Sequence, residues 1–339
     1  MLGAGAQLGR LAYDVAGAED AIVRQVRRGL TVYRSAYYQT AAWQAQVGAR
    51  EVAVDSISGW TDDLFPPVES FRMFDYLKSL DPLWPVEVRT ADIGHPRAQN
   101  PPAQWHQLND EANDFLAANI GGSHRQATDV RSLPTLCGGN TADGEVTAPT
   151  PQALAGGRLR VNFQGGGTTT SAGGIADPNG PATDPVTSSQ VISQVVPGPN
   201  CRQSTGPAEG GYTAYSEPLR RSATMVGLGT VRVNYTLAGA PETSLDVRLW
   251  DAGPDGHTRL VSRGAYRIDA PAYNRLYEVI EVPFFGNHWT FAAGHKIRLD
   301  ITQADTPTFR PSSLPSSLTF EPPRLDLPVL GSSLTVSGS

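Results

Sequence analysis

The sequence predicts a chain of two fold classes, a partial parallel α/β sheet followed by an antiparallel β-sandwich. Three observations lead to this prediction. Strand and helix patterns alternate before about residue 122, period-2 hydrophobic alternation dominates from residue 214, and a stretch rich in Gly, Pro, Ser and Thr lies between them. Alternating strands and helices are typical of parallel sheets, whereas short alternating strands with turn signals are typical of sandwiches.

The bulk composition excludes several classes of protein. The chain has 339 residues, of which 40% are hydrophobic and 18% are charged, so it can bury the cores of two domains. Its formal net charge is −6, and the Lys and Arg residues are scattered, whereas a nucleic-acid groove needs a basic stripe. No stretch approaches the roughly 18–20 apolar residues of a membrane span. We therefore expect no nucleic-acid partner and no membrane span.

Apolar residues recur at helical spacing over residues 22–30, which predicts an amphipathic helix. A group of aromatic residues follows, on a second helix or its entry. These side chains either line a substrate cleft or pack the two helices together, and the sequence leaves both interpretations open. The group consists of Tyr33, Tyr37, Tyr38 and Trp43.

Two strand and helix units come next. Residues 51–57 form a short apolar run rich in β-branched side chains, which is typical of a buried strand. Residues 67–80 show helical spacing behind two prolines, a common helix start. A second strand is predicted over residues 86–91 and a second helix over residues 107–118. The pattern accounts for two strands of a parallel sheet.

The middle of the chain, residues 138–207, is dominated by Gly, Pro, Ser and Thr. Its glycine cluster at residues 165–170 is not followed by Lys and has no strand-to-helix context, so we interpret it as a loop and not as a phosphate site. Cys137 and Cys201 flank this stretch. A disulfide between them would suit an oxidising compartment and favour secretion, and two unpaired thiols are the alternative.

Period-2 alternation defines the last region. Residues 231–237, 245–249 and 297–301 each alternate apolar and polar side chains, as half-buried strands do. Turn signals separate the runs, at residues 253–256, 269–271 and 286–287. We therefore expect an antiparallel sandwich here.

Asp62 and His95 are the residues that point to chemistry. Each follows one of the two predicted parallel strands, so both are expected at the same edge of the sheet. A carboxylate that orients a histidine is the acid and base arrangement of serine hydrolases, which carry the triad in the order Ser, Asp, His. The alternative from spacing alone is a hydrogen-bonded structural histidine.

The residues around this pair resemble one hydrolase family. The segment Gly59–Pro66, GWTDDLFP, resembles the acid-bearing segment of the X-Pro dipeptidyl-peptidase and cocaine-esterase hydrolases. The segment Gly94–Asn100, GHPRAQN, resembles the histidine segment of the same family. The resemblance implies that Asp62 is the orienting acid, with Asp63 as the neighbouring alternative, and that His95 is the general base.

The resemblance continues into the last region. Residues 261–267 and 293–299 resemble strands of the jelly-roll domain that follows the α/β-hydrolase domain in this family. This makes His295 a residue of the sandwich and not a catalytic one. The fold implied by the resemblance is a C-terminal remnant of an α/β-hydrolase domain followed by a jelly-roll sandwich.

The implied domain boundaries follow from this comparison. Residues 1–122 are expected to be a partial α/β-hydrolase domain, with cap helices at about 1–48 and the acid and histidine strands within 51–122. Residues 123–213 are expected to hold the connection and the first sandwich strands. Residues 214–339 are expected to form the main part of the jelly roll.

The family pattern breaks at the nucleophile. No Gly-Xaa-Ser-Xaa-Gly elbow precedes Asp62, so we identify no nucleophile and expect an N-terminally truncated chain that is inactive alone. Completed by the missing half, it would act on an ester or a peptide. No histidine pair has metal-ligand spacing, so we expect no metal and no cofactor. The remaining histidines are His106, His124, His257 and His288.

A non-catalytic role is the alternative function. In this interpretation the jelly roll binds a ligand such as a sugar, or a partner chain, and replacing His95 changes nothing. Sandwich folds host many functions, so the fold class alone cannot decide between the two.

Overall fold

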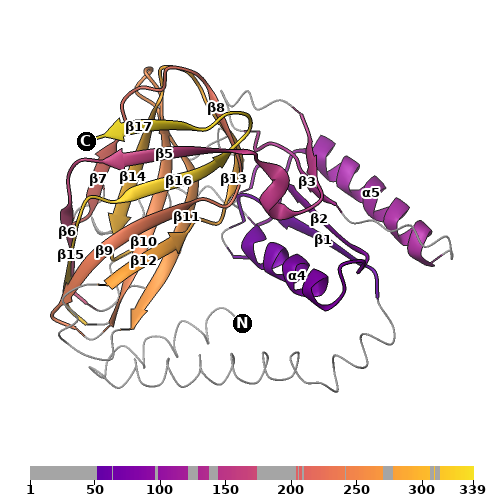
Figure 1. The fold of residues 1–339 in the computed structure, drawn as a ribbon, viewed down its shortest axis with the longest axis horizontal. Coiled ribbons are helices and arrows are strands. Elements are labelled where there is room, and N and C mark those ends of the chain that lie inside the picture. Colours follow the sequence, from indigo (N-terminus) through magenta and orange to yellow (C-terminus); the bar gives the residue numbers. More distant parts are fainter. Residues whose placement is uncertain are drawn as a thin grey trace.

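The computed structural model describes residues 52–62, 64–95, 98–120, 129–136, 144–173, 204, 206–207, 210–240, 242–269, 278–305, 309 and 314–339. These residues are mostly β-structure with two α-helices, arranged as a small α/β sheet beside a larger pair of sheets (Figure 1). Several predicted features lie outside the described residues, namely the cap helices, Tyr33, Tyr37, Tyr38, Trp43, Asp63, Cys137 and Cys201.

The small sheet has the strand order β1-β2-β3-β4. The strands β1 (Val54–Gly59), β2 (Val86–Ala91) and β3 (Val130–Ser132) are parallel, and β4 (Val146–Ala148) runs antiparallel to β3. The strand β2 has the predicted bounds, whereas β1 begins three residues after the predicted start and ends two residues after the predicted end. The strands β3 and β4 were not predicted. A three-residue strand such as β3 or β4 is too short to show a hydrophobic period, which is why the sequence did not reveal either one.

The two helices cover opposite faces of this sheet. The helix α4 (Pro67–Leu80), predicted at these bounds, buries Phe71 and Phe74 against the valines of β2. The helix α5 (Pro102–Ile120) begins five residues before the predicted start, because Pro102 suits the first helical turn. On its face, Leu108 packs with apolar residues at the end of β2. Both faces of β2 are therefore buried, as expected for a parallel strand.

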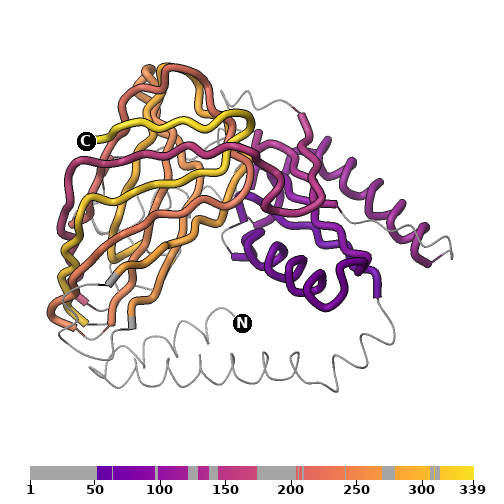
Figure 2. The backbone as a smooth tube through the Cα atoms, viewed as in Figure 1, coloured from indigo at the N-terminus to yellow at the C-terminus, as the bar shows by residue number. Residues whose placement is uncertain are grey.

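The larger body consists of two sheets. One sheet has the order β11-β10-β14-β7, and the other contains nine of the described strands. Figure 2 shows the C-terminal strand β17 running alongside β5, with which it pairs in parallel. The strands of this body are β5 (Gly157–Phe163), β6 (Gly167–Ser171), β7 (Tyr212–Tyr215), β8 (Ala223–Gly227), β9 (Thr230–Ala238), β10 (Glu242–Ala252), β11 (Thr258–Asp269), β12 (Glu278–Pro283), β13 (Asn287–Phe291), β14 (Lys296–Thr302), β15 (Ser316–Phe320), β16 (Arg324–Val329) and β17 (Leu334–Gly338).

The inward side chains of the two sheets form one apolar core. On β10, Leu245, Val247 and Leu249 are fully buried and share this core with residues of the facing sheet, such as Val231 and Leu325. The period-2 pattern predicted these inward positions correctly, because successive side chains of a strand point to opposite faces. The short 3-10 helix Pro151–Leu154 leads from β4 into the first of these strands.

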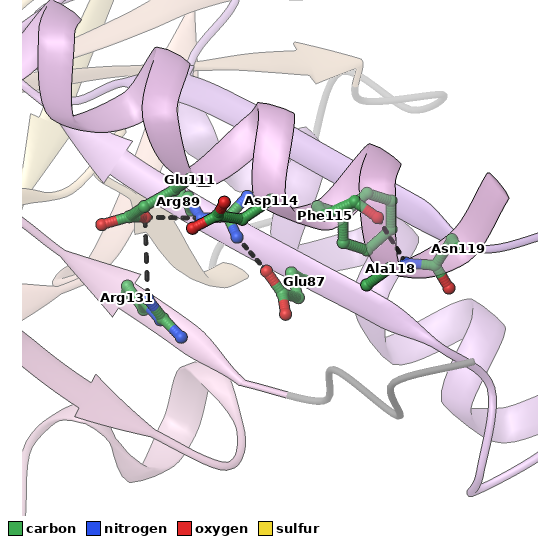
Figure 3. Close-up of a pocket in the computed structure, with 8 residues that line it drawn as sticks. All are labelled: Glu87, Arg89, Glu111, Asp114, Phe115, Ala118, Asn119 and Arg131. Carbon is green, nitrogen blue, oxygen red and sulfur yellow. Dashed lines mark hydrogen bonds and ion pairs between the residues drawn. The ribbon is translucent and has the colours of Figure 1, made fainter. Parts of the chain in front are cut away.

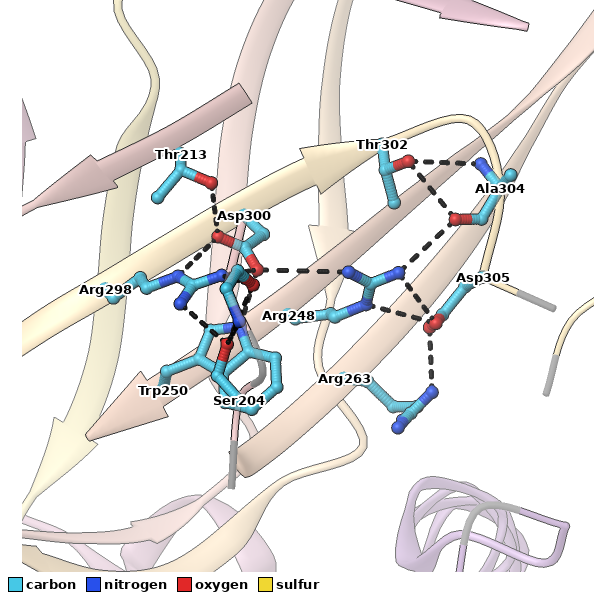
Figure 4. A network of polar contacts seen from close by, with 11 residues as sticks. Ser204, Thr213, Arg248, Trp250, Arg263, Arg298, Asp300, Thr302, Ala304 and Asp305 are labelled. Atoms are coloured by element: carbon cyan, nitrogen blue, oxygen red, sulfur yellow. Dashed lines mark hydrogen bonds and ion pairs between the residues drawn. The ribbon is translucent and has the colours of Figure 1, made fainter. Parts of the chain in front are cut away.

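The outward face of β10 is also buried, although its alternation resembles that of an exposed face. Asp305 accepts hydrogen bonds from Arg248 Nε (3.0 Å) and Arg263 Nη1 (2.9 Å), and Asp300 pairs with Arg298 (Figure 4). Burying a charge is tolerated only when it is paired. These ion pairs explain how a strand with polar outward residues can be covered on both faces.

The glycine cluster is not wholly a loop, and the prediction for it was wrong in part. Gly167 begins β6, which pairs with β15 through a run of threonines. Threonine is β-branched and suits a strand. A Cβ on Gly166 would lie 2.3 Å from the carbonyl oxygen of Phe320, so the glycine permits a close backbone approach between the two strands.

Polar side chains join the two bodies. Trp60 Nε1 donates to Ser132 Oγ (3.1 Å), and Ser132 Oγ lies 3.0 Å from Nδ1 of His288, which belongs to β13. Thr135 Oγ1 donates to Asn287 Oδ1 (2.5 Å). Burial lowers the pKa of His288 to about 4. The junction therefore holds a neutral histidine, and it lies next to the segment that carries Asp62.

Candidate active site

The parallel pairing of β1 and β2 brings Asp62 and His95 together. Gly59 at the end of β1 is in register with Ala91 at the end of β2, so the segments that follow the two strands leave the sheet at the same edge. His95 Nδ1 and Asp62 Oδ2 are 2.8 Å apart. The expectation that the two side chains meet at this edge is confirmed.

Asp62 is held by hydrogen bonds on both carboxylate oxygens. Its Oδ1 accepts from the backbone N–H groups of Leu64 (2.9 Å) and Phe65 (3.0 Å), while its Oδ2 accepts from the His95 backbone N–H (3.3 Å) and contacts the ring. Burial alone would raise the pKa of Asp62, but the hydrogen bonds from His95, Phe65 and Leu64 outweigh it and lower the pKa. The carboxylate is thus fixed in its ionised form.

Two glycines make this close contact possible. A Cβ on Gly59 would lie 1.7 Å from the carbonyl oxygen of Ile93, and a Cβ on Gly94 would lie 2.5 Å from Asp62 Oδ2. Gly94 also has a φ of +127°, a conformation essentially restricted to glycine. Both glycines belong to the motifs that suggested the site. Sterics therefore explain why each motif contains glycine at that position.

The imidazole of His95 presents its other edge to solvent. Its side chain is 45% exposed, whereas that of Asp62 is 7% exposed. A carboxylate that accepts from Nδ1–H fixes the tautomer with a lone pair on Nε2. The Phe65 ring packs beside the imidazole, with 5.3 Å between ring centroids and 41° between planes. The arrangement can therefore accept a proton at Nε2 while Asp62 stabilises the resulting imidazolium.

Asp92 and Asn100 are residues of this site that sequence reasoning gave no role. Asp92 is buried and accepts from Thr61 Oγ1 (2.7 Å) and from the backbone N–H groups of Gln99 (3.1 Å) and Leu136 (3.0 Å). The backbone N–H of Asn100 donates to the Asp92 carbonyl (2.9 Å). Asp92 thus ties the acid loop to the histidine loop. Its position directly after β2 was the signal that could have identified it.

A second histidine with a carboxylate partner lies in the sandwich. His295 Nδ1 is 2.7 Å from Asp251 Oδ1, at the turn between β13 and β14, as its assignment to the sandwich implied. Among the described residues, no group of three or more His, Cys, Asp or Glu side chains is arranged to hold a metal ion.

A small hollow of about 50 Å³ beside α5 is lined mainly by charged side chains (Figure 3). Arg89 bridges Asp55, Glu87 and Glu111 there, and Arg131 lies 3.7 Å from Glu111. Burial raises the pKa of Glu87 and Asp55, partly offset by Arg89. The hollow has room for little more than water, so we assign these residues to the packing of α5 on the sheet.

Comparison with known proteins gives structural but no sequence relatives. No protein-family model matches the chain, and neither does any curated protein. Among solved structures, an aminopeptidase from a marine sediment Thaumarchaeota archaeon aligns over 87% of this chain and 58% of its own, with a TM-score of 0.60 and 13% identity. An alpha-amino acid ester hydrolase aligns over 94% of this chain and 62% of its own, with a TM-score of 0.57 and 14% identity.

The aligned part of the chain shares the fold of the corresponding part of these two proteins. The chain spans less than two thirds of the length of either one. A CocE/NonD family hydrolase from Staphylococcus aureus aligns with a TM-score of 0.47 and 7% identity. At 13% and 14% identity, the likeness to the aminopeptidase and the ester hydrolase establishes the fold alone. Within the described residues, neither helix is both long and apolar enough to cross a membrane.

Proposed function

We propose that this chain supplies the acid and the base of a Ser-Asp-His acyl hydrolase of the X-Pro dipeptidyl-peptidase and cocaine-esterase type. The observation that carries the proposal is the 2.8 Å contact between Asp62 Oδ2 and His95 Nδ1 at the carboxyl edge of two parallel strands. The buried carboxylate suits the orienting acid of such a triad, and the exposed imidazole suits its general base.

The two residues would act in sequence during acyl transfer. His95 Nε2 takes the proton of the nucleophilic serine as its oxygen attacks the substrate carbonyl carbon. The imidazolium then gives this proton to the leaving alcohol or amine as the bond to the carbonyl carbon breaks, which leaves an acyl-enzyme. Water attacks the acyl-enzyme by the same route. Asp62 stays ionised throughout, in keeping with its lowered pKa.

The nucleophile is proposed to come from a segment outside the printed sequence. No Gly-Xaa-Ser-Xaa-Gly elbow precedes Asp62, and triads of this fold class require one before the acid. The chain alone is then expected to be inactive. Esters and peptides are the proposed substrates, because the structural neighbours are described as an ester hydrolase and an aminopeptidase.

The domain assignment belongs to the same proposal. We propose that β1 to β3 with α4 and α5 are the last part of an α/β-hydrolase domain, and that the two larger sheets form a jelly roll. The parallel order of β1, β2 and β3 supports the first part. The shared core of the two facing sheets supports the second.

The test begins with the DNA directly upstream of the Met1 codon. If it encodes a strand, a serine elbow and a helix, the joined polypeptide is expressed and assayed with a 4-nitrophenyl ester, an X-Pro amide and a fluorophosphonate probe for active serines. We expect hydrolysis and labelling by the joined polypeptide and neither by the present chain. A joined polypeptide that is folded yet inactive on all three reagents would favour the non-catalytic binding role.

A further inference from the structure

Asn100 has a backbone conformation that needs an explanation. Its φ is +51°, and it is the one non-glycine residue with a positive φ in the part of the chain that the structure describes. Asparagine tolerates this left-handed region better than most residues, but the conformation still costs energy. Such a residue persists only where surrounding contacts hold it, and these positions cluster at functional sites.

The contacts of Asn100 converge on the loop that carries His95. Its Oδ1 accepts from the backbone N–H of Gly94 (2.9 Å) and from Trp105 Nε1 (3.1 Å). Its Nδ2 donates to the carbonyl groups of Gly94 (3.1 Å) and Ala98 (3.3 Å). The side-chain amide therefore binds both the N–H and the C=O of Gly94, the residue directly before His95.

We infer that Asn100 is a positioning residue that sets the orientation and tautomer of His95, an inference that rests on the proposed function. By holding both polar groups of Gly94, it fixes the peptide that leads into His95. That peptide delivers the His95 backbone N–H and ring Nδ1 to the same oxygen of Asp62. Trp105 in α5 donates a hydrogen bond to the Asn100 side chain, so the helix restrains the histidine loop through this amide.

The strained backbone has a role in this arrangement. With φ at +51°, the Asn100 backbone N–H reaches the Asp92 carbonyl while its side chain turns back to Gly94. The histidine loop is thereby closed at both ends by one residue. Contacts that lock the support of a catalytic side chain are what keeps such a side chain within the narrow geometry that catalysis needs.

The experiment measures the tautomer of His95 in the 339-residue chain, and it needs no substrate. The ¹⁵N shifts of Nδ1 and Nε2 are read through the carbon-bound ring protons in wild type and in Asn100→Ala, Asn100→Gly and Asn100→Asp. Asn100→Gly removes the amide but accepts the positive φ, so it separates the amide from backbone strain. Asn119→Ala is the matched control, because this asparagine bonds Phe115 O at the far end of α5.

We expect wild type and Asn119→Ala to hold His95 as the Nδ1–H tautomer. Asn100→Ala and Asn100→Gly should both shift it toward the mixture of an unrestrained imidazole. Asn100→Asp keeps the acceptor for the Gly94 N–H. Its fraction of the Nδ1–H tautomer should therefore lie between that of wild type and that of Asn100→Ala. The ring signals of His295 report that the sandwich remains folded in every variant.

The inference is overturned if Asn100→Gly keeps the wild-type tautomer, since the amide would then be dispensable. It is also overturned if Asn119→Ala shifts the tautomer as much as Asn100→Ala, since the effect would then be general loosening of α5. Neither result depends on hydrolysis. An inactive joined polypeptide would instead refute the proposed function and leave the tautomer measurement as it stands.

Discussion

Two Asp–His pairs in the described part of the chain have almost the same contact geometry. In the loop pair, Asp62 and His95, the two atoms are 2.8 Å apart, and in the sandwich pair, Asp251 and His295, they are 2.7 Å apart. Both carboxylates are nearly buried, and each histidine directly follows a glycine with positive φ. The contact distance therefore does not distinguish the pair proposed to be catalytic from the sandwich pair.

The difference lies in what surrounds each pair. The His95 side chain is 45% exposed, while that of His295 is 18% exposed. Asp251 also accepts from Trp289 Nε1 (3.0 Å), which ties it to the sandwich core. Burial raises the pKa of Asp251 despite these bonds, whereas hydrogen bonds lower the pKa of Asp62. The loop pair is therefore distinguished by a more exposed imidazole and by an acid whose pKa is lowered and not raised.

The largest expected difference between the pairs is in hydrolysis by the joined polypeptide. Asp62→Asn should lower kcat by about 10⁴-fold, because the imidazole loses the carboxylate that fixes its tautomer. Asp251→Asn should change kcat by no more than about twofold, because it lies outside the site. Steady-state rates on one ester, with both variants checked for folding, measure the contrast. Equal losses would remove the distinction between the pairs.

The second largest difference is expected in stability, when the glycine before each histidine is replaced by alanine. Gly94→Ala is expected to lower the free energy of unfolding by about 3 kcal/mol, since the new Cβ meets Asp62 and φ stays strained. Gly294→Ala meets open space, so only the backbone strain of roughly 1–2 kcal/mol remains. Urea unfolding of both variants gives the comparison. A larger loss for Gly294→Ala would contradict the packing described for the loop pair.

The two acids should give opposite pH dependences of stability. Asp62 has a lowered folded-state pKa, so its contribution is present above the unfolded value of 3.8 and is lost as the pH falls through the folded value. Asp251 has a raised pKa, so its contribution is present below 3.8 and is lost as the pH rises through the folded value. Unfolding of wild type, Asp62→Asn and Asp251→Asn across this range should show the two opposite slopes, and slopes of the same sign would reject the assignment.

The smallest expected effect concerns the aromatic neighbour of the loop pair. Phe65→Ala should lower hydrolysis by the joined polypeptide about two- to tenfold, because an aromatic contact contributes roughly 0.5–1.5 kcal/mol to holding the imidazole. Stability should change by less than about 0.5 kcal/mol, since Phe65 is exposed. Leu64→Ala, at the neighbouring exposed position, is the control and should leave the rate unchanged.

The sequence revealed the loop pair because its elements are local and long enough to read. The strand Val86–Ala91 and the helix Pro67–Leu80 were predicted at their observed bounds, and they place His95 and the acid loop. Short strands such as Val130–Ser132 carry no readable period and were missed.

Long-range pairings were the part that the sequence could not predict. Nothing in the neighbourhood of His295 indicates that Asp251 is its partner, because β10 and the β13–β14 turn meet only in the folded sheet. The buried pairing of Arg248 with Asp305 likewise joins residues that are 57 positions apart in the sequence. The role of Asn100 was hidden for a different reason, because its contacts with Gly94 and Trp105 are local in the sequence but appear only when the loop closes.

The proposed role of His95 is tested most directly by the effect of His95→Ala on fluorophosphonate labelling of the joined polypeptide, with His295→Ala as its counterpart. We predict that His95→Ala slows labelling of the serine by about 10³-fold or more, because the serine loses its general base, while His295→Ala is labelled at the wild-type rate. Labelling that continues at the wild-type rate in His95→Ala would show that the loop pair is not the acid and base of a hydrolase.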